Sequence, residues 1–306
     1  MADAWLHRLA LTTAGTTLFL LFVGALVTSK GAGLAVPDWP TTFGHNMFLF
    51  PWAGMVGGVF YEHSHRLVAS GVGFLTLVLA VLLWLKEPRA WVRWLGTAAL
   101  LLVTVQGVVG GLRVVWLEQD FAIVHAALAQ AFFGLIVAMA LFTSRSWSEA
   151  RPRQSGGDGT MFQWFCLTTT LLIYAQSLLG AVIRHTGTAV ALHVLMALVV
   201  AVQTGLLVLK ALQLGGRAPV FKTLSLSLGL LLMLQLALGT GSYAARFMAF
   251  GAAWQPGLIV AVTAGHVVTG ALMFALSLSM TLWAFRLLGV GRFPVVDGVV
   301  SERATA

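Results

Sequence analysis

The chain contains almost no cysteine: Cys166 is the only one among its 306 residues. A single thiol excludes an intrachain disulfide, and it also excludes cysteine clusters of the kind that hold a metal. Because Cys166 lies within a long apolar stretch, we expect a buried and inert thiol there. The chemistry of the chain must therefore depend on other side chains.

Charged residues are also scarce, at 9% of the chain against 59% hydrophobic residues. A soluble domain usually carries about 25% charged residues, so most of this surface is expected to face lipid. Apolar segments of about 20 residues can cross a bilayer as helices. The sequence contains eight such segments, at 9–28, 65–85, 91–112, 122–143, 161–183, 189–209, 220–241 and 258–285. None alternates polar and apolar residues as barrel strands do, so the predicted fold class is an all-α polytopic membrane protein.

The first apolar segment is predicted to be a retained helix. It is longer than the apolar region of a typical signal peptide, and no small-residue cleavage site follows it. No Arg- and Ser-rich presequence precedes it, which favours a bacterial inner (cytoplasmic) membrane over an organelle precursor.

The net charge of +8 is explained by topology and does not indicate a nucleic-acid partner. With the N-terminus inside, thirteen cations fall in cytoplasmic segments: Arg8, Lys86, Arg89, Arg93, Arg145, Arg151, Arg153, Lys210, Arg217, Lys222, Arg286, Arg292 and Arg303. Five fall on the outer side: Lys30, Arg66, Arg113, Arg184 and Arg246. This asymmetry follows the positive-inside rule and predicts eight spans with both termini cytoplasmic.

A polar segment rich in Gly, Ser and Arg divides the chain into two similar halves. We predict an N-terminal four-helix bundle at 1–145, a cytoplasmic linker at 146–160, a C-terminal four-helix bundle at 161–290 and a cytoplasmic tail at 291–306. The odd-numbered spans share a Gln-x-x-x-Gly pattern at their outer ends, in Gln106–Gly110, Gln176–Gly180 and Gln235–Gly239, while Leu20 and Gly24 take those places in the first span. The glycines suit close helix packing or a flat cofactor edge against bare backbone, and the two interpretations are compatible.

Each even-numbered span opens with a histidine, at His65, His125, His193 and His266. Superposing the halves pairs His65 with His193 and His125 with His266. Ionisable residues inside a membrane are costly and usually face a bundle interior. One such histidine could be a hydrogen-bonded structural residue, but four at equivalent depth are better explained as ligands.

Two imidazoles projecting into a four-helix bundle suit axial ligation of haem iron. Zinc would need three or four ligands, and a proton relay would need carboxylates within the spans. The haem propionates could pair with the outer arginines, namely Arg66, Arg113, Arg184 and Arg246. Interfacial snorkelling explains any one of these arginines equally well.

Glu62 makes the halves unequal, because residues 191 and 192 before His193 are both apolar. If the helix extends back one turn, Glu62 and His65 share a face, and a carboxylate there could act as an acid or base. Alternatively, a glutamate in a first helical turn favourably meets the helix dipole. His63 lies about 200° from His65 around the helix, so the two histidines cannot face the same haem.

The Glu62-x-x-His65-Arg66 motif, the three further histidines and the loop sequence VPDWP at 36–40 resemble haem A synthase across essentially the whole chain. That family oxidises the C8 methyl group of haem O to a formyl group by successive hydroxylations. The resemblance implies the substrate haem between His65 and His125, with Glu62 needed for turnover. It also implies a haem b between His193 and His266 that relays electrons.

This chain departs from the family pattern because it lacks the cysteine pairs that many members carry in their outer loops. The long loop 29–63 is still a candidate cover for the substrate site, although its tryptophans could equally be interfacial anchors. His7, His45 and His185 are not expected to bind haem.

Two other functions remain open: a dihaem b-type electron-transfer cytochrome, and a haem carrier or insertion factor. A prenyltransferase is discarded, because the spans contain no aspartate for magnesium and diphosphate. The expected partners are haem O, the prenyltransferase that makes it, a membrane electron acceptor and the lipid bilayer. A homo-oligomer is compatible with the sequence.

Overall fold

The computed structural model describes residues 4–152, 157–214 and 219–288. The predicted tail at 291–306, part of the predicted linker and four of the cations, Arg153, Arg217, Arg292 and Arg303, lie outside these residues. Eight described helices are long and apolar enough to cross a membrane, which confirms the predicted all-α fold class of a multi-pass membrane protein.

The membrane helices of the N-terminal half are α1 (Ala4–Ser29), α2 (Gly57–Lys86), α3 (Ala90–Trp116) and α4 (Gln119–Phe142). Those of the C-terminal half are α6 (Gly157–Thr186), α7 (Val190–Leu214), α8 (Pro219–Phe247) and α9 (Pro256–Leu287). A short helix, α5 (Arg145–Glu149), lies between the halves, and three 3-10 turns occur at η1 (Met47–Leu49), η2 (Trp52–Gly54) and η3 (Ala249–Ala253).

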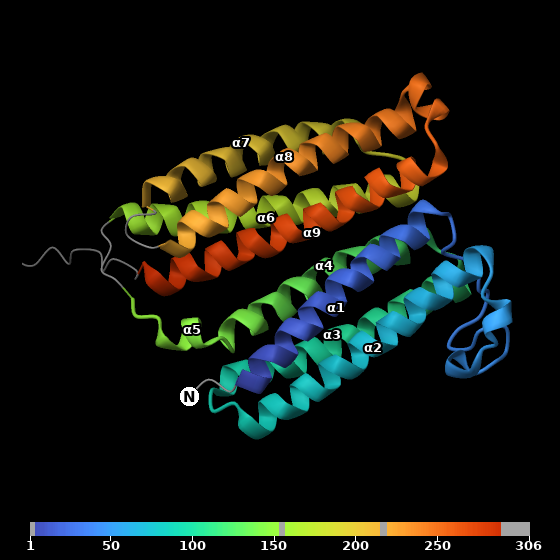
Figure 1. Cartoon of the computed structure of the whole chain (residues 1–306), viewed down its shortest axis with the longest axis horizontal. Helices are drawn as coiled ribbons and strands as arrows, with labels where there is room; N and C mark the ends of the chain where they lie inside the picture. Colours follow the sequence, from blue (N-terminus) through green and yellow to red (C-terminus); the bar gives the residue numbers. More distant parts are fainter. Residues whose placement is uncertain (1–3, 153–156, 215–218, 289–306) are drawn as a thin grey trace, which may run out of the picture.

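The helices pack as two groups of four that lie side by side (Figure 1). In each group, every helix contacts the helices before and after it in the chain, and the first also contacts the last. The groups meet where α1 and α4 pack against α9 and where α4 packs against α6. The small cluster of Phe133, Ala271 and Ala275 fills part of this contact.

Loop 30–56 lies at one end of the molecule, beside the end of α1 and the start of α2, and we call this end the loop end (Figure 1). The described chain begins in α1 and ends after α9, both at the opposite end. Tight turns keep consecutive helices adjacent: Leu117, with φ of 59°, ends α3 in the left-handed region, two residues before α4 begins.

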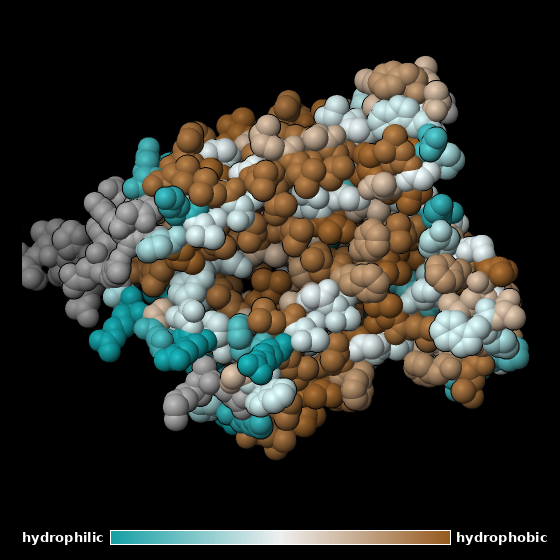
Figure 2. Space-filling view, viewed as in Figure 1, coloured by the Kyte–Doolittle hydropathy of each residue, from teal (hydrophilic) through white to brown (hydrophobic). Residues whose placement is uncertain are grey.

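The surface between the two ends is apolar, and hydrophilic residues gather toward the ends (Figure 2). Large side chains on it are exposed, such as Phe74 at 65% and Leu230 at 72%. In a soluble protein so wide an apolar surface would drive aggregation, whereas in a bilayer it contacts lipid. Many hydroxyl groups inside the spans donate to the carbonyl four residues earlier, as Thr17 does to Thr13, so these hydroxyls are satisfied without water.

The predicted linker is partly ordered and packed. Within it, α5 buries Trp147 against Trp283 of α9, with ring centroids 5.1 Å apart. Arg286 of α9 donates to the backbone carbonyls of Trp147 and Ala150. Helix α6 begins at Gly157, four residues earlier than the predicted span. The division of the chain into two domains stays a prediction.

Candidate functional site

The four histidines form two pairs, one inside each group of helices. The ring centroids of His65 on α2 and His125 on α4 are 6.5 Å apart, with the rings at 82°. Those of His193 on α7 and His266 on α9 are 6.4 Å apart, with the rings at 73°. The structure therefore brings together the histidines that the sequence predicted to face each other, at the same spacing in both halves.

Each of the four imidazoles lies on a glycine of the preceding helix. The shortest distances from an ideal Cβ at the glycine to the ring are 3.5 Å for Gly24 and His65, 3.2 Å for Gly110 and His125, 3.4 Å for Gly180 and His193, and 2.9 Å for Gly239 and His266. The repeated glycine thus lets each ring lie close to the neighbouring helix backbone, and at Gly239 a Cβ atom would force the ring to move. The glycine repeat of the odd-numbered spans and the histidines of the even-numbered spans therefore belong to the same contact, which occurs four times.

The Nδ1 atoms of all four rings are buried and have no hydrogen-bond partner. An unsatisfied buried polar atom costs roughly 1–3 kcal/mol, so four equivalent ones indicate a group that binds between the rings. A metal–imidazole bond of about 2 Å on each side would place two ring centroids roughly 6 Å apart, close to the observed spacing. Both pairs therefore fit one iron atom with two axial imidazoles.

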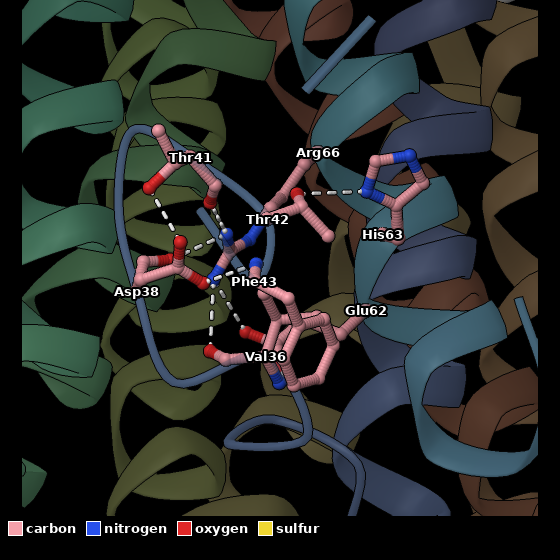
Figure 3. A network of polar contacts seen from close by, with 8 residues as sticks. All are labelled: Val36, Asp38, Thr41, Thr42, Phe43, Glu62, His63 and Arg66. Carbon is pink, nitrogen blue, oxygen red and sulfur yellow. Dashed lines mark hydrogen bonds and ion pairs between the residues drawn. The ribbon is translucent and has the colours of Figure 1, made fainter. Parts of the chain in front are cut away.

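Helix α2 begins at Gly57, well before the predicted start at residue 65. Glu62 is therefore part of the helix and lies one turn before His65. Its side chain is buried and both of its oxygens accept hydrogen bonds. Oε2 accepts from the backbone N–H of Val36 at 2.9 Å, and Oε1 accepts from Arg66 at 3.0 Å. Glu62 therefore connects the helix that carries His65 to loop 30–56 (Figure 3).

Arg66 is the centre of the loop contacts (Figure 3). Besides Glu62, its guanidinium donates to the carbonyls of Val36 at 3.2 Å, Asp38 at 2.7 Å and Thr41 at 3.0 Å. Its side chain is 11% exposed. Both Nη1 and Nη2 of Arg66 thus donate to loop residues or to Glu62. Its predicted role in binding a propionate stays a prediction.

Asp38 closes the loop on itself. Its carboxylate accepts from the Thr41 hydroxyl and from the backbone N–H groups of Phe43 and Gly44. Burial opposes ionisation of this carboxyl, but the hydrogen bonds from Gly44, Thr41 and Phe43 outweigh it and hold the Asp38 pKa below its usual value. Residues 36–45 therefore form a turn organised around one carboxylate.

His63, which the sequence placed away from the haem, holds the same loop from the other side of α2. It is 1% exposed, its Nδ1 lies 3.1 Å from the Thr42 hydroxyl, and its ring packs on Phe50 with centroids 5.1 Å apart. Sequence reasoning missed this role. The apolar neighbours of His63 on its helix face indicate burial. No local sequence pattern predicts that its partner is Thr42, which lies 21 residues earlier.

Trp39 brings the loop to the neighbourhood of His125. An ideal Cβ on Gly111 of α3 would clash with the Trp39 indole, so the indole lies directly on that glycine. The adjacent Gly110 carries the ring of His125. The loop therefore reaches α3 next to the first histidine pair, as expected of a cover, whereas Trp52 is 80% exposed.

The other outer arginines lie at the loop end in different settings. The Arg113 guanidinium packs over Gly33 of the loop. Arg184 of α6 crosses to α1, where it donates to the Ala25 carbonyl at 2.8 Å and the Ser29 hydroxyl at 3.0 Å. Arg246 at the end of α8 is exposed. Binding of propionates by these three also stays a prediction.

The remaining histidines belong to neither pair. His7 lies near the opposite end, with Nδ1 2.9 Å from the Ala140 carbonyl. His45 packs on Phe50 within loop 30–56. His185 follows Arg184 near the end of α6.

Comparison with known proteins identifies relatives of this chain. The model of the cytochrome oxidase assembly protein family matches residues 51–194, a range that includes Glu62 and three of the four histidines. A haem A synthase of Shouchella clausii is 27% identical over 191 residues, or 61% of this chain and 61% of the relative. Those of Geobacillus kaustophilus and Lysinibacillus sphaericus are 27% and 28% identical, covering 58% and 61% of this chain and 56% and 60% of the relatives. The chain thus matches about three fifths of the length of these curated relatives.

Proposed function

Because the model of the cytochrome oxidase assembly protein family matches residues 51–194 of this chain, and because bacterial haem A synthases are similar to it, we propose that it oxidises haem O to haem A. The C8 methyl group of the substrate would become a formyl group by successive hydroxylations. The observation that carries the proposal is the inequality of two otherwise similar histidine pairs. Among the described residues, only the pair of His65 and His125 has a buried carboxylate, Glu62, one helical turn from one of its members.

In this proposal the two halves divide the work. His65 and His125 would hold the substrate haem, and His193 and His266 would hold a resident haem b. The haem groups supply the redox chemistry when they are bound. The imidazoles would hold each haem between two helices, and the glycines beside them leave room for the rings.

Glu62 is the proposed catalytic carboxylate. Oxidation of a methyl group releases protons, and a carboxylate within one turn of an axial ligand is placed to accept one. Arg66 donates to Oε1 of Glu62, and the Val36 N–H donates to Oε2, so both contacts orient the carboxylate. The same two contacts fasten loop 30–56, so the loop and the carboxylate are positioned together and Trp39 limits access of water from the loop end.

The location follows from the charge asymmetry of the sequence. We infer that both termini are cytoplasmic and that the loop end, with both histidine pairs nearer to it, faces the outer side of the cell membrane. The partners in this setting are a membrane prenyltransferase that supplies haem O and a membrane electron acceptor. Arg66, Arg113, Arg184 and Arg246 remain the candidates for propionate binding.

A dihaem electron-transfer cytochrome is the second candidate, and the near-identical spacing of the two histidine pairs favours it. The decisive experiment expresses the protein with a source of haem O and an electron acceptor, then extracts and chromatographs the pigments. Haem A or a hydroxylated haem O is expected. Finding only unmodified haems in membranes that contain the folded protein would leave the electron-transfer function and reject the enzyme.

The assignment of the halves has its own test. His193→Ala and His266→Ala should remove the tightly held low-spin haem b spectrum, whereas His65→Ala should leave it. If His65→Ala removes that spectrum instead, the roles of the two halves are reversed.

A further inference from the structure

Glutamine side chains accompany three of the four histidines. Gln106, Gln176 and Gln235 each lie four residues before a glycine that receives an imidazole, so amide and glycine share one face of their helix. The amide oxygens of all three are buried without a hydrogen-bond partner. An unused amide acceptor therefore recurs three times on the helix face that receives an imidazole.

Two of the three glutamines contact a histidine through the amide nitrogen. Gln235 Nε2 lies 3.4 Å from His266 Nε2, and Gln176 Nε2 donates to the backbone carbonyl of His193 at 2.9 Å. Gln106 is 8% exposed on the helix that faces His125. Gln235 and Gln176 are thus placed to hold the ring of one histidine and the peptide group that carries another, and Gln106 takes the same place in the repeated pattern.

The fourth position lacks this group. His65 rests on Gly24, and the residue four before that glycine is Leu20, which packs into the apolar core of the N-terminal half. The C-terminal pair therefore has an amide beside both histidines, and the N-terminal pair has one beside His125 only. The histidine without a neighbouring amide is therefore His65, which follows Glu62 on α2.

We propose that Gln106, Gln176 and Gln235 are positioning residues for axial imidazoles, and that Leu20 leaves His65 as the readily exchanged ligand of an iron porphyrin. The inference rests on the proposed function, because it assumes one haem in each half. A group that hydrogen-bonds a ligating histidine fixes its ring, and losing it typically lowers metal affinity about 10–100-fold. A substrate haem must enter and its product must leave, while a resident haem must stay. The distribution of amides matches that difference.

The test measures how fast each half releases haem. Full-length protein in lipid nanodiscs is loaded with haem b and mixed with an excess of apomyoglobin, a soluble haem acceptor. Two phases are expected, a fast one from the N-terminal half and a slow one from the C-terminal half. Leu20→Gln should slow the fast phase about 10–100-fold, and Gln235→Met should accelerate the slow phase by a similar factor.

Methionine gives matched controls, because its length is close to that of glutamine but it has no amide. Leu20→Met should leave the fast phase unchanged. The low-spin haem spectrum of each variant reports whether both imidazoles still bind, which a general loss of packing would not preserve. Gln176→Met provides a second measurement on the slow phase, so that a folding failure of Leu20→Gln does not decide the result.

Unchanged release from both Leu20→Gln and the two Gln→Met variants would overturn the inference. Equal acceleration by Gln235→Met in both phases would also overturn it, because the effect would then be global. The proposed function is judged separately by pigment extraction. A protein that makes haem A but shows unaltered release rates refutes the role of the glutamines alone. One that makes no haem A but shows the expected rates supports that role and refutes the enzyme.

Discussion

At the scale of single residues, the clearance between glycine and imidazole differs from one hairpin to the next. A Cβ at Gly239 would lie 2.9 Å from the His266 ring, closer than carbon atoms normally approach, whereas one at Gly24 would lie 3.5 Å from His65. The second distance is an ordinary van der Waals contact. The four glycines are therefore not equally necessary.

Gly239→Ala is expected to displace His266 and weaken the low-spin haem spectrum of the C-terminal half. Gly24→Ala is the matched control and should preserve the spectrum of the N-terminal half. Alanine favours a helix over glycine by about 1 kcal/mol, so any loss at Gly239 must come from the ring contact. The measurement is absorption spectroscopy of the purified, haem-loaded variants, and equal spectra for both would contradict the steric explanation.

Glu62 has two roles that a single substitution confounds, since it is both the proposed catalytic group and an anchor of loop 30–56. Glu62→Gln is expected to retain haem and to stop formation of haem A. Thr42→Val is the control, because it removes the bond to His63 and loosens the same loop without touching the carboxylate. Product chromatography should show activity in Thr42→Val only. Full activity in Glu62→Gln would show that Glu62 anchors the loop and takes no part in the reaction.

The sequence predicted the histidine pairs because four copies of one pattern leave little choice of partner. The angular argument that separated His63 from His65 also holds, since the two side chains contact different parts of the protein. The contacts of Arg66 could not be predicted in this way. They join a helix to an irregular loop some 25 to 30 residues earlier, and no periodic pattern records such a contact.

At the scale of elements, the helix ends differ most from the prediction. Hydropathy predicted a start at residue 65 for the second span and at residue 258 for the last, but α2 and α9 begin at Gly57 and Pro256. Polar residues at the loop end of α2 lower the mean hydropathy without breaking the helix. As a result, His65 and His266 lie deeper than two turns from their helix starts, while His125 and His193 lie closer.

Loop 30–56 should loosen in acid. Because hydrogen bonds hold the pKa of Asp38 below its usual value of 3.8, the folded loop favours the charged form. The stabilisation is complete above the usual pKa and is lost as the pH falls through the lower value of the folded loop. Hydroxyl-radical footprinting of Trp39 at neutral pH and near pH 2 should show greater labelling in acid.

Asp38→Asn is the control for this experiment. The amide cannot titrate and keeps only one acceptor oxygen, so labelling of Trp39 should be higher at neutral pH and should change less with acid. A wild-type loop whose labelling is the same at both pH values would contradict the assignment of the turn to the Asp38 carboxylate.

At the scale of the whole molecule, polar contacts at the loop end join the two halves. The Ser29 hydroxyl at the end of α1 lies 3.0 Å from the Thr263 hydroxyl of α9, and Arg184 of α6 donates to the same serine. Tyr174 of α6 donates to the Ala127 carbonyl of α4. The halves are thus connected near both histidine pairs.

A disulfide is expected to form between Ser29→Cys and Thr263→Cys in a Cys166→Ala background, because the two hydroxyls that the thiols replace lie 3.0 Å apart and an S–S bond of about 2 Å needs only a small further approach. A protease site inserted between residues 151 and 157 allows the chain to be cut. On a non-reducing gel the oxidised double variant should run as one band after cleavage, and either single variant as two. Two bands from the double variant would contradict the packing of α1 against α9.

Composition and hydropathy were sufficient to predict eight spans, because every segment that crosses lipid must be an apolar stretch of about 20 residues. The contact surface between the halves was not predictable. Both sides of it are apolar, and apolar side chains that face lipid look the same in a sequence as those that face another helix. Ala271 and Ala275 illustrate this, since they are buried between the halves in a span that is apolar throughout.

The contacts of Arg66, Asp38 and His63 have a consequence for how this protein matures. A loop fastened by hydrogen bonds and an ion pair reaches its final form as soon as the chain folds, without a thiol oxidase or isomerase. Reducing agents cannot open it, and the redox state of the surroundings does not change it. The sole cysteine is buried within α6. This chain can therefore assemble its loop equally well under reducing and oxidising conditions.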